Sequence, residues 1–194
     1  MGFFFYFLRK EVASFSAYGN SSPEEGPVLL KLQEMIGLPV FDLSNGKQVG
    51  KVLDILLKED WSISGIQLEG KKLFSSNIKA VRWEDIIAYG EDAVMIRSQQ
   101  AIQRWRAENI QLTYMDGNSK LKELPVLTAD GVTIGYVTDV YFDQEMGNTI
   151  TGIEISDGFV SDLMEGRKRL PFIPEMSMGE NAIMVPPGSE QRLE

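Results

Sequence analysis

The chain has 194 residues, and its 28 acidic and 19 basic side chains leave a formal net charge of −9 at pH 7. It contains no cysteine and no histidine, which excludes disulfides, thiolate-bound metals and nucleophiles activated by histidine. The charge also disfavours a broad surface for nucleic acid or anionic lipid, although a local basic patch is compatible with it. We therefore expect a protein that is not an enzyme and that has no cofactor and no metal centre.

Residues 1–28 lack the pattern of the rest of the chain. Their apolar run, Phe3 to Leu8, is much shorter than the roughly 20 residues of a membrane-spanning helix. The basic residues Arg9 and Lys10 follow the run, whereas a secretory signal places its charges before it. We expect a tail that is disordered, an extended start or a self-association surface, with an interfacial membrane anchor as the alternative. The expected location is cytoplasmic, with no transmembrane segment.

One pattern then occurs twice along the chain. The first copy comprises Gly37-Leu38-Pro39-Val40, Asn45-Gly46, Gly50, Val52, Asp54 and Gly65-Ile66. The second comprises Leu124-Pro125-Val126, Asp130-Gly131, Gly135, Val137, Asp139 and Gly152-Ile153. Each copy is long enough to own a small core, so the sequence predicts two homologous domains rather than a solenoid. We place repeat 1 at 29–97, a linker at 98–120, repeat 2 at 121–187 and a tail without further folded structure at 188–194.

Within each repeat the apolar runs are short and separated by turn residues. Asn45-Gly46 and Asp130-Gly131 predict a β-hairpin with a type I′ turn at the start of each repeat. A further strand is expected at 63–68 and at 150–155, then a divergent crossover at 71–79 and at 159–169, then a strand, a turn and a strand. Such a series predicts small antiparallel β-barrels, because closing the sheet removes its edges.

The segment between the repeats has a different pattern. Ile102, Trp105 and Leu112 recur at roughly helical spacing, which predicts a short linker helix over about 98–110. Arginines surround the tryptophan, and together they form the best local candidate for a contact with RNA or with another anionic partner: Arg97, Arg104, Trp105 and Arg106. The alternative interpretation, which we prefer, is a helix that packs Trp105 on a barrel while its arginines extend into solvent. We expect Trp61 and Trp83 in the core or at a barrel mouth.

Several of these motifs resemble the PRC-barrel domain, in a match covering nearly all of 36–97 and most of 123–186. The resemblance is carried by Gly37–Phe41, Asn45-Gly46, Gly50–Asp54, Trp83–Ile86 and Gly90–Val94. PRC-barrels occur in the H subunit of photosynthetic reaction centres, at the carboxyl end of a ribosome maturation factor, and in uncharacterised bacterial and archaeal proteins. The resemblance implies a six-stranded β-barrel with a binding or adaptor role, and it transfers no catalytic residue. Repeat 2 departs from the pattern, with Leu170-Pro171-Phe172 where repeat 1 has Val81-Arg82-Trp83.

The carboxylates of the repeated pattern have structural and functional interpretations. Asp54 and Asp139 are expected to accept backbone N–H groups in the turn that follows each strand. Asp139, Asp143 and Glu145 could supply oxygen ligands to a cation, but their spacing does not fit a calcium-binding loop. We favour hydrogen bonding for both aspartates and expect no catalytic pair.

The fold class expected from all of this is mainly β: two small antiparallel PRC-type barrels in tandem, joined by a short helical linker. The expected function is that of a non-enzymatic adaptor that binds another protein, through the divergent crossovers or the groove between the barrels. The alternative is an RNA- or ribosome-associated maturation factor, and a homo-oligomer is compatible with either.

Overall fold

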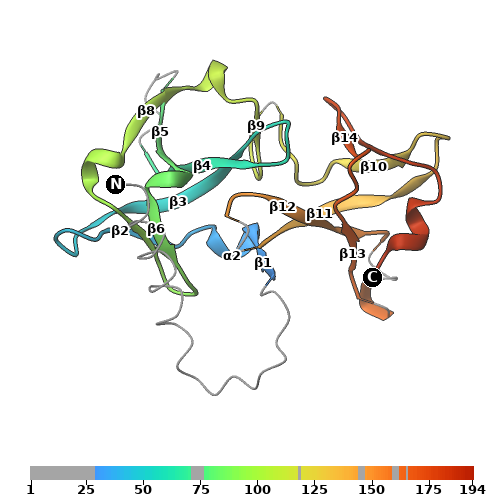
Figure 1. Cartoon of the computed structure of the whole chain (residues 1–194), viewed down its shortest axis with the longest axis horizontal. Helices are drawn as coiled ribbons and strands as arrows, with labels where there is room; N and C mark the ends of the chain where they lie inside the picture. The colour runs from blue at the N-terminus through green and yellow to red at the C-terminus, as the bar shows by residue number, and fades with distance from the viewer. Residues whose placement is uncertain (1–28, 71–76, 118, 144–146, 159–161, 165) are drawn as a thin grey trace.

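The computed structural model describes residues 29–70, 77–117, 119–143, 147–158, 162–164 and 166–194 (Figure 1). The expected tail at 1–28 and the candidate ligand Glu145 therefore lie outside the described residues. So do most of the first crossover and part of the second. The remaining elements fall into two sheets, which form the left and right halves of Figure 1.

The sheet of repeat 1 has the order β6-β7-β2-β3-β4-β5-β8, with β9 paired to β3. Its strands are β2 (Pro39–Asp42), β3 (Gln48–Leu57), β4 (Ile63–Leu68), β5 (Asn77–Arg82), β6 (Ile86–Tyr89), β7 (Val94–Ile96), β8 (Gln103–Arg106) and β9 (Leu112–Thr113). Single turns of 3-10 helix connect some of them: η1 (Trp83–Asp85), η2 (Gln99–Ala101) and η3 (Ala107–Asn109). Trp61 and Trp83 are buried, as expected.

The sheet of repeat 2 follows the same plan, in the order β13-β12-β11-β10-β15-β14, with β1 paired to β11. Its strands are β10 (Pro125–Thr128), β11 (Thr133–Asp143), β12 (Ile150–Ser156), β13 (Lys168–Pro171), β14 (Ser177–Met178) and β15 (Ile183–Val185). Two further elements begin repeat 1 ahead of β2, namely β1 (Leu29–Lys31) and the one-turn helix α2 (Leu32–Met35). The mainly β fold with two PRC-type barrels in tandem is confirmed.

The sheets are not purely antiparallel, which corrects one detail of the expected fold. β2 pairs in parallel with β7, and β10 pairs in parallel with β15. The opening strand of each repeat thus pairs with the closing strand of the same repeat and curls the sheet round on itself. The hairpins are present, but their turns are not type I′, which needs positive φ at both central residues. Gly46 and Gly131 have φ of +68° and +89°, whereas Asn45 and Asp130 are not left-handed.

The linker is extended rather than helical, which corrects the interpretation of 98–110. Residues 103–106 form β8, which pairs with β5 and extends the first sheet. The apparent helical spacing arises because two 3-10 turns alternate with short strands. The tail also departs from expectation, because η4 (Ser189–Arg192) is folded and Glu194 exchanges two backbone hydrogen bonds of 2.9 Å with Arg169.

The two repeats exchange their leading strands. β1, at the start of repeat 1, pairs with β11 of repeat 2, while β9, in the segment before repeat 2, pairs with β3 of repeat 1. In Figure 1 the blue β1 accordingly lies against the orange half of the molecule. Each barrel is therefore completed by a short strand from the segment that leads into the other repeat.

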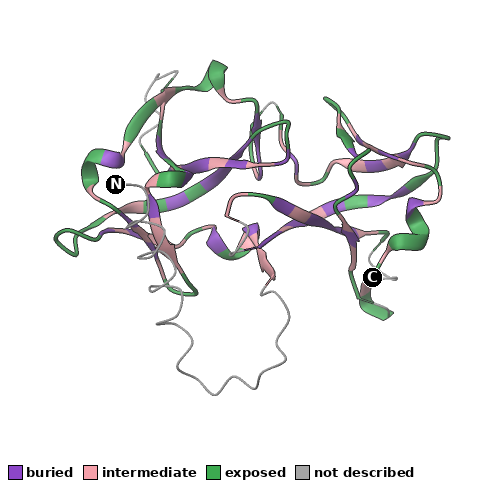
Figure 2. Cartoon of the chain, viewed as in Figure 1, coloured by how far each residue is buried: buried purple, intermediate pink, exposed green. Residues whose placement is uncertain are grey.

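A pseudo-two-fold joint holds the repeats together. Ser62 and Thr149 form an antiparallel bridge, around which Ile63 N–H donates to Asn148 O at 2.7 Å and Ile150 N–H donates to Trp61 O at 3.0 Å. One buried cluster includes residues of both repeats, and buried segments run through both halves of the chain in Figure 2. Phe142 of repeat 2 makes an edge contact with Trp83 of repeat 1, at 5.8 Å between ring centroids.

Close strand packing explains one pair of glycines in the repeated pattern. A Cβ on Gly65 would lie 2.2 Å from the carbonyl oxygen of Val81, and one on Gly152 would lie 2.8 Å from that of Leu170. Both contacts are closer than a real Cβ tolerates, so either strand would have to shift to admit a side chain. Both repeats therefore have glycine at the position where the third strand packs closely on the fourth, β4 on β5 in repeat 1 and β12 on β13 in repeat 2.

Candidate interaction site

The crossover of repeat 2 presents two exposed apolar side chains on its described part. Residues 162–164 form a helical turn, closed by Asp162 N–H to Gly158 O at 2.9 Å and by Gly166 N–H to Asp162 O at 3.1 Å. Leu163 and Met164 on this turn have 76% and 81% of their surface exposed, the two highest values among the large exposed apolar residues of the described chain. Exposed apolar side chains at one place on a surface are typical of a contact site.

Polar contacts anchor this turn to the barrel. The carboxylate of Asp162 accepts a hydrogen bond of 2.7 Å from Ser156 Oγ and forms an ion pair with Arg167 at 3.6 Å. Arg167 also donates to Oε2 of Glu154 at 3.2 Å. Contacts of Asp162 and Arg167, on either side of Leu163 and Met164, therefore tie the turn to the barrel.

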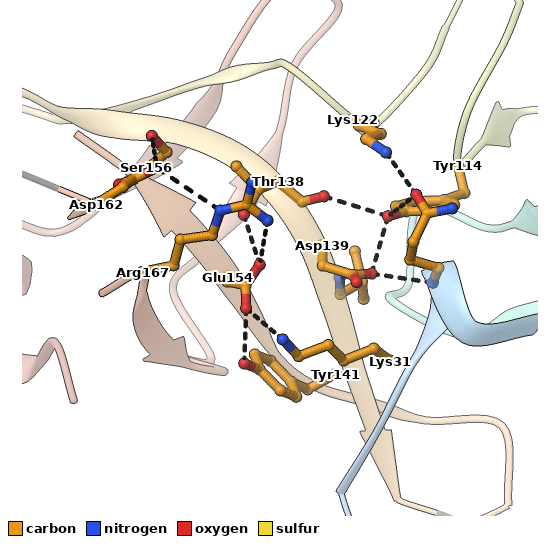
Figure 3. A network of polar contacts seen from close by, with 12 residues as sticks. Lys31, Tyr114, Lys122, Thr138, Asp139, Tyr141, Glu154, Ser156, Asp162 and Arg167 are labelled. Atoms are coloured by element: carbon orange, nitrogen blue, oxygen red, sulfur yellow. Dashed lines mark hydrogen bonds and ion pairs between the residues drawn. The ribbon is translucent and has the colours of Figure 1, made fainter. Parts of the chain in front are cut away.

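Glu154 is the centre of the polar network drawn in Figure 3. Its side chain is only 5% exposed, and both of its oxygens are used. Oε1 accepts from Lys31 Nζ at 2.5 Å and from Tyr141 Oη at 3.1 Å, while Oε2 accepts from Thr138 Oγ1 at 2.9 Å and from Arg167. A buried carboxylate with this number of donors is a structural anchor, since little acceptor capacity remains for a ligand.

The protonation of the network follows from these contacts. Burial alone would raise the pKa of Glu154, but the hydrogen bonds from Lys31 and Thr138 outweigh burial and lower that pKa. The hydrogen bond to Glu154 raises the pKa of Lys31 in turn. Both groups are therefore charged at neutral pH. Lys31 lies in β1 and Arg167 in the crossover, so Glu154 connects the exchanged strand with the exposed turn.

A second buried carboxylate, Asp139, holds the segment that follows β1. Its Oδ1 accepts from Gln33 N–H at 3.1 Å, from Val140 N–H at 2.8 Å and from Tyr114 Oη at 2.9 Å. Burial is the main reason that the pKa of Asp139 is raised. The Tyr114 hydroxyl has its pKa raised by its own burial and by the charge of Asp139. Lys122 completes this side with a 2.5 Å contact to Gln33 Oε1.

Asp54 has the matching role in repeat 1. Its Oδ1 accepts from Ile55 N–H at 2.7 Å and from Met115 N–H at 2.8 Å, and its Oδ2 accepts from Asp116 N–H at 2.9 Å. The two aspartates do accept backbone N–H groups, as expected. None of these donors belongs to the following turn, however. Ile55 and Val140 are the next residues of the same strands, and the other backbone donors lie in the segments that lead into the other repeat.

The predicted RNA-contact residues do not form one surface of the expected kind. Trp105 lies opposite Ile78 in the β5–β8 pair, whereas Arg104 and Arg106 lie opposite Lys79 and Asn77. Side chains alternate along a strand, so the two arginines share one face and the tryptophan occupies the other. Arg97 lies just beyond β7, and its backbone N–H donates to Asp85 O at 3.1 Å.

The candidate cation ligands form no described metal site. Asp139 is committed to the hydrogen bonds described above, and Glu145 lies outside the described residues. Among the residues that the structure describes, no three acidic side chains are grouped closely enough to hold a metal ion. The described helices likewise include none with the length and apolar character needed to cross a membrane.

Sequence reasoning missed Glu154 and its partners. The signal was a charged residue between Ile153 and Ile155 in a strand that is otherwise apolar, because a buried carboxylate requires donors. The donors themselves could not have been named, since Lys31 is 123 residues away. The divergent crossover was expected to extend over 159–169, but Arg169 lies in β13 and pairs with Glu194 at 2.8 Å.

The fold and this site together define a tandem β-barrel protein whose polar contacts connect its two repeats. The PRC-barrel domain profile matches the chain twice, over residues 27–102 and 115–192, so the chain belongs to the PRC-barrel family. Both matches begin close to the exchanged strands and extend beyond the boundaries that the repeated pattern suggested. Comparison with curated proteins finds no significant match.

Proposed function

We propose that the protein is a non-enzymatic adaptor that binds another protein through the crossover turn of repeat 2. The observation that carries the proposal is the exposure of Leu163 and Met164 on a turn that is anchored at both ends. Contacts that already tie the turn to the barrel lower the entropic cost of binding, because fewer groups must be ordered when the partner arrives. Family membership agrees with a binding role, as PRC-barrels are protein-interaction modules.

The groove between the barrels is a weaker candidate for the interface. The joint is occupied by buried side chains of both repeats, including Trp83 and Phe142. The composition, which lacks cysteine and histidine, supports a non-enzymatic role and agrees with a cytoplasmic location in a bacterial cell. The buried carboxylates support the same role, because Asp54, Asp139 and Glu154 are occupied by donors from the chain itself.

The test is a comparison of partners captured by the full chain and by a Leu163→Ser, Met164→Ser double variant. A matched control is Leu43→Ser, which changes a 55% exposed leucine in repeat 1. We expect a defined protein that the wild type and the control retain after nuclease treatment and that the double variant loses. Equal capture by all three proteins would contradict the proposal, and partners lost on nuclease treatment would favour the RNA- or ribosome-associated alternative.

A further inference from the structure

A separate feature of repeat 1 is a cationic hollow beside the outer strand of the first sheet. A surface hollow there is lined by Val49, Lys79, Gln99, Ile102, Gln103 and Arg104. Val49 and Ile102 are half-buried and apolar, whereas Lys79 and Arg104 are exposed. The hollow therefore combines an apolar component with two cations and two side-chain amides.

The two cations face each other directly. Lys79 of β5 and Arg104 of β8 are partners in the antiparallel register. Like charges at directly opposed positions destabilise a sheet. Neither side chain forms an ion pair with any described residue, although the chain as a whole has an excess of acidic groups. A pair of cations left without acids in an acidic protein indicates an anionic group supplied from outside.

The backbone beside this pair is open as well. Among the described strands, β8 is the last in its sheet and pairs with β5 alone, and its residues are exposed or half-buried in Figure 2. The outer edge of a terminal strand presents N–H and C=O groups that an added extended strand can pair with. Nucleic acid makes no such ladder, and Trp105 lies on the face opposite Arg104, so base stacking and phosphate pairing would be divided between two faces.

We propose that the edge of β8, with Lys79 and Arg104, binds an extended acidic peptide segment of a partner protein. The peptide adds to the sheet as a strand, its carboxylates contact the two cations, and its apolar side chains enter the hollow beside Val49 and Ile102. The positive charge of the hollow favours a peptide of acidic sequence, and the open strand edge favours a peptide in extended conformation. This surface is distinct from the crossover of repeat 2, so the inference does not rest on the function proposed above.

The test uses the full chain and two fluorescent peptides of equal length, one alternating Glu with Val and the other alternating Lys with Val. We expect the acidic peptide to bind more tightly and to weaken with rising salt. Lys79→Gln and Arg104→Gln should each weaken it about tenfold, since each removes a charge-assisted hydrogen bond. Lys58→Gln, which removes an exposed cation from the turn between β3 and β4, should leave the affinity unchanged.

A second measurement distinguishes strand addition from loose attraction. Hydrogen exchange of the amides at 103–106 should slow when the acidic peptide binds, and exchange in β13 of repeat 2 should not change. Equal binding of both peptides would overturn the proposal, as would unchanged exchange in β8. A single-stranded oligonucleotide that binds more tightly than the acidic peptide and loses affinity in the same two variants would overturn it in favour of RNA.

Discussion

The carboxylate of Asp54 in repeat 1 accepts the backbone N–H of Met115, 61 residues further along the chain, at 2.8 Å. Asp139 makes the mirrored contact with Gln33, which lies in the segment that leads from β1 into β2 of repeat 1. The two aspartates of the repeated pattern thus hold the exchanged segments, and the tandem has the construction of a dimer with mutual strand exchange formed within one chain. We therefore expect the two repeats to fold as one unit rather than as two independent domains.

The two aspartates should nevertheless respond differently to the same substitution. The donors to Asp54 are divided between its two oxygens, so in Asp54→Asn the amide group must face a buried N–H. The donors to Asp139 all reach Oδ1, and in Asp139→Asn the single carbonyl oxygen can serve them. We expect Asp54→Asn to lower the free energy of unfolding by about 2 kcal/mol and Asp139→Asn by about 1 kcal/mol or less.

Chemical denaturation of both variants measures this difference. Asp60→Asn is the control, because Asp60 is an exposed turn residue whose Oδ1 accepts from Ser62 alone. A larger loss for Asp139→Asn than for Asp54→Asn would contradict the assignment of donors to oxygens.

Strand exchange predicts that the whole chain unfolds in a single transition. All three tryptophans, Trp61, Trp83 and Trp105, lie before repeat 2, so tryptophan fluorescence reports on repeat 1 and on the joint, where Trp61 and Trp83 contact aromatic residues of repeat 2. Ile153→Val in repeat 2 removes one buried methyl group and should cost about 1 kcal/mol. We expect it to lower the midpoint of the fluorescence transition as much as the equivalent change Ile66→Val does. A fluorescence midpoint that responds only to Ile66→Val would show that the repeats unfold separately.

The polar network around Glu154 predicts a stability difference that depends on pH. Its folded-state pKa lies below the ordinary value of 4.5, so the charged form contributes stability above that value and loses it as the pH falls through the folded pKa. We expect Glu154→Gln to lower the free energy of unfolding at pH 7 by about 1 to 2 kcal/mol, a range reduced because Lys31 and Arg167 remain partly solvated. The difference from wild type should shrink when the pH is lowered below 4.

Denaturation series of the two proteins at several pH values test this. Glu108→Gln is the matched control, since its ion pair with Arg106 is about 70% exposed on both sides and should contribute little at any pH. A Glu154→Gln deficit that is constant from pH 7 to pH 3 would mean that the deficit does not come from the charge.

Local sequence patterns predicted the strands within each repeat well, but they did not predict how the two repeats are joined. Glycine in turns and alternating apolar residues depend on neighbours in sequence, so the hairpins and the strand at 63–68 were found from the sequence. Strand exchange could not be predicted in this way, because Leu29–Lys31 could pair with the equivalent strand of either sheet. In the structure it pairs with β11 of repeat 2, while β9 pairs with β3 of repeat 1. The linker was misread because Trp105 and Leu112 have a spacing that two 3-10 turns and two short strands also produce.

The site was harder to predict because its contacts are specific to one repeat. Gln67 stands in repeat 1 where Glu154 stands in repeat 2, and Leu56 where Tyr141 stands, so the repeated pattern contains no trace of the network. Leu163 and Met164 were inside the divergent crossover that the sequence indicated as a contact region, although their exposure required the structure.

A final prediction concerns backbone strain at the entry to each repeat. Gly37 has φ of +82°, and its N–H donates to Val52 O; Glu123 has φ of +72°, and its N–H donates to Val137 O. The two residues are therefore equivalent, but only glycine adopts this conformation without strain. Glu123→Gly should raise the free energy of unfolding by up to about 1 kcal/mol, because the strain released exceeds the exposed ion pair lost with Lys120 and the added freedom of the unfolded chain.

The converse change, Gly37→Ala, should destabilise the protein by about 1 kcal/mol although a Cβ there meets no atom within 4 Å. Gly90→Ala is the control, because Gly90 also has open space around it but no left-handed φ. Thermal and denaturant unfolding should show a higher free energy of unfolding for Glu123→Gly and a lower one for Gly37→Ala. For Gly90→Ala the free energy should change by no more than about 0.5 kcal/mol. If Gly37→Ala matched Gly90→Ala, the left-handed turn would not be a source of strain, and the preference for glycine at this position would need another cause.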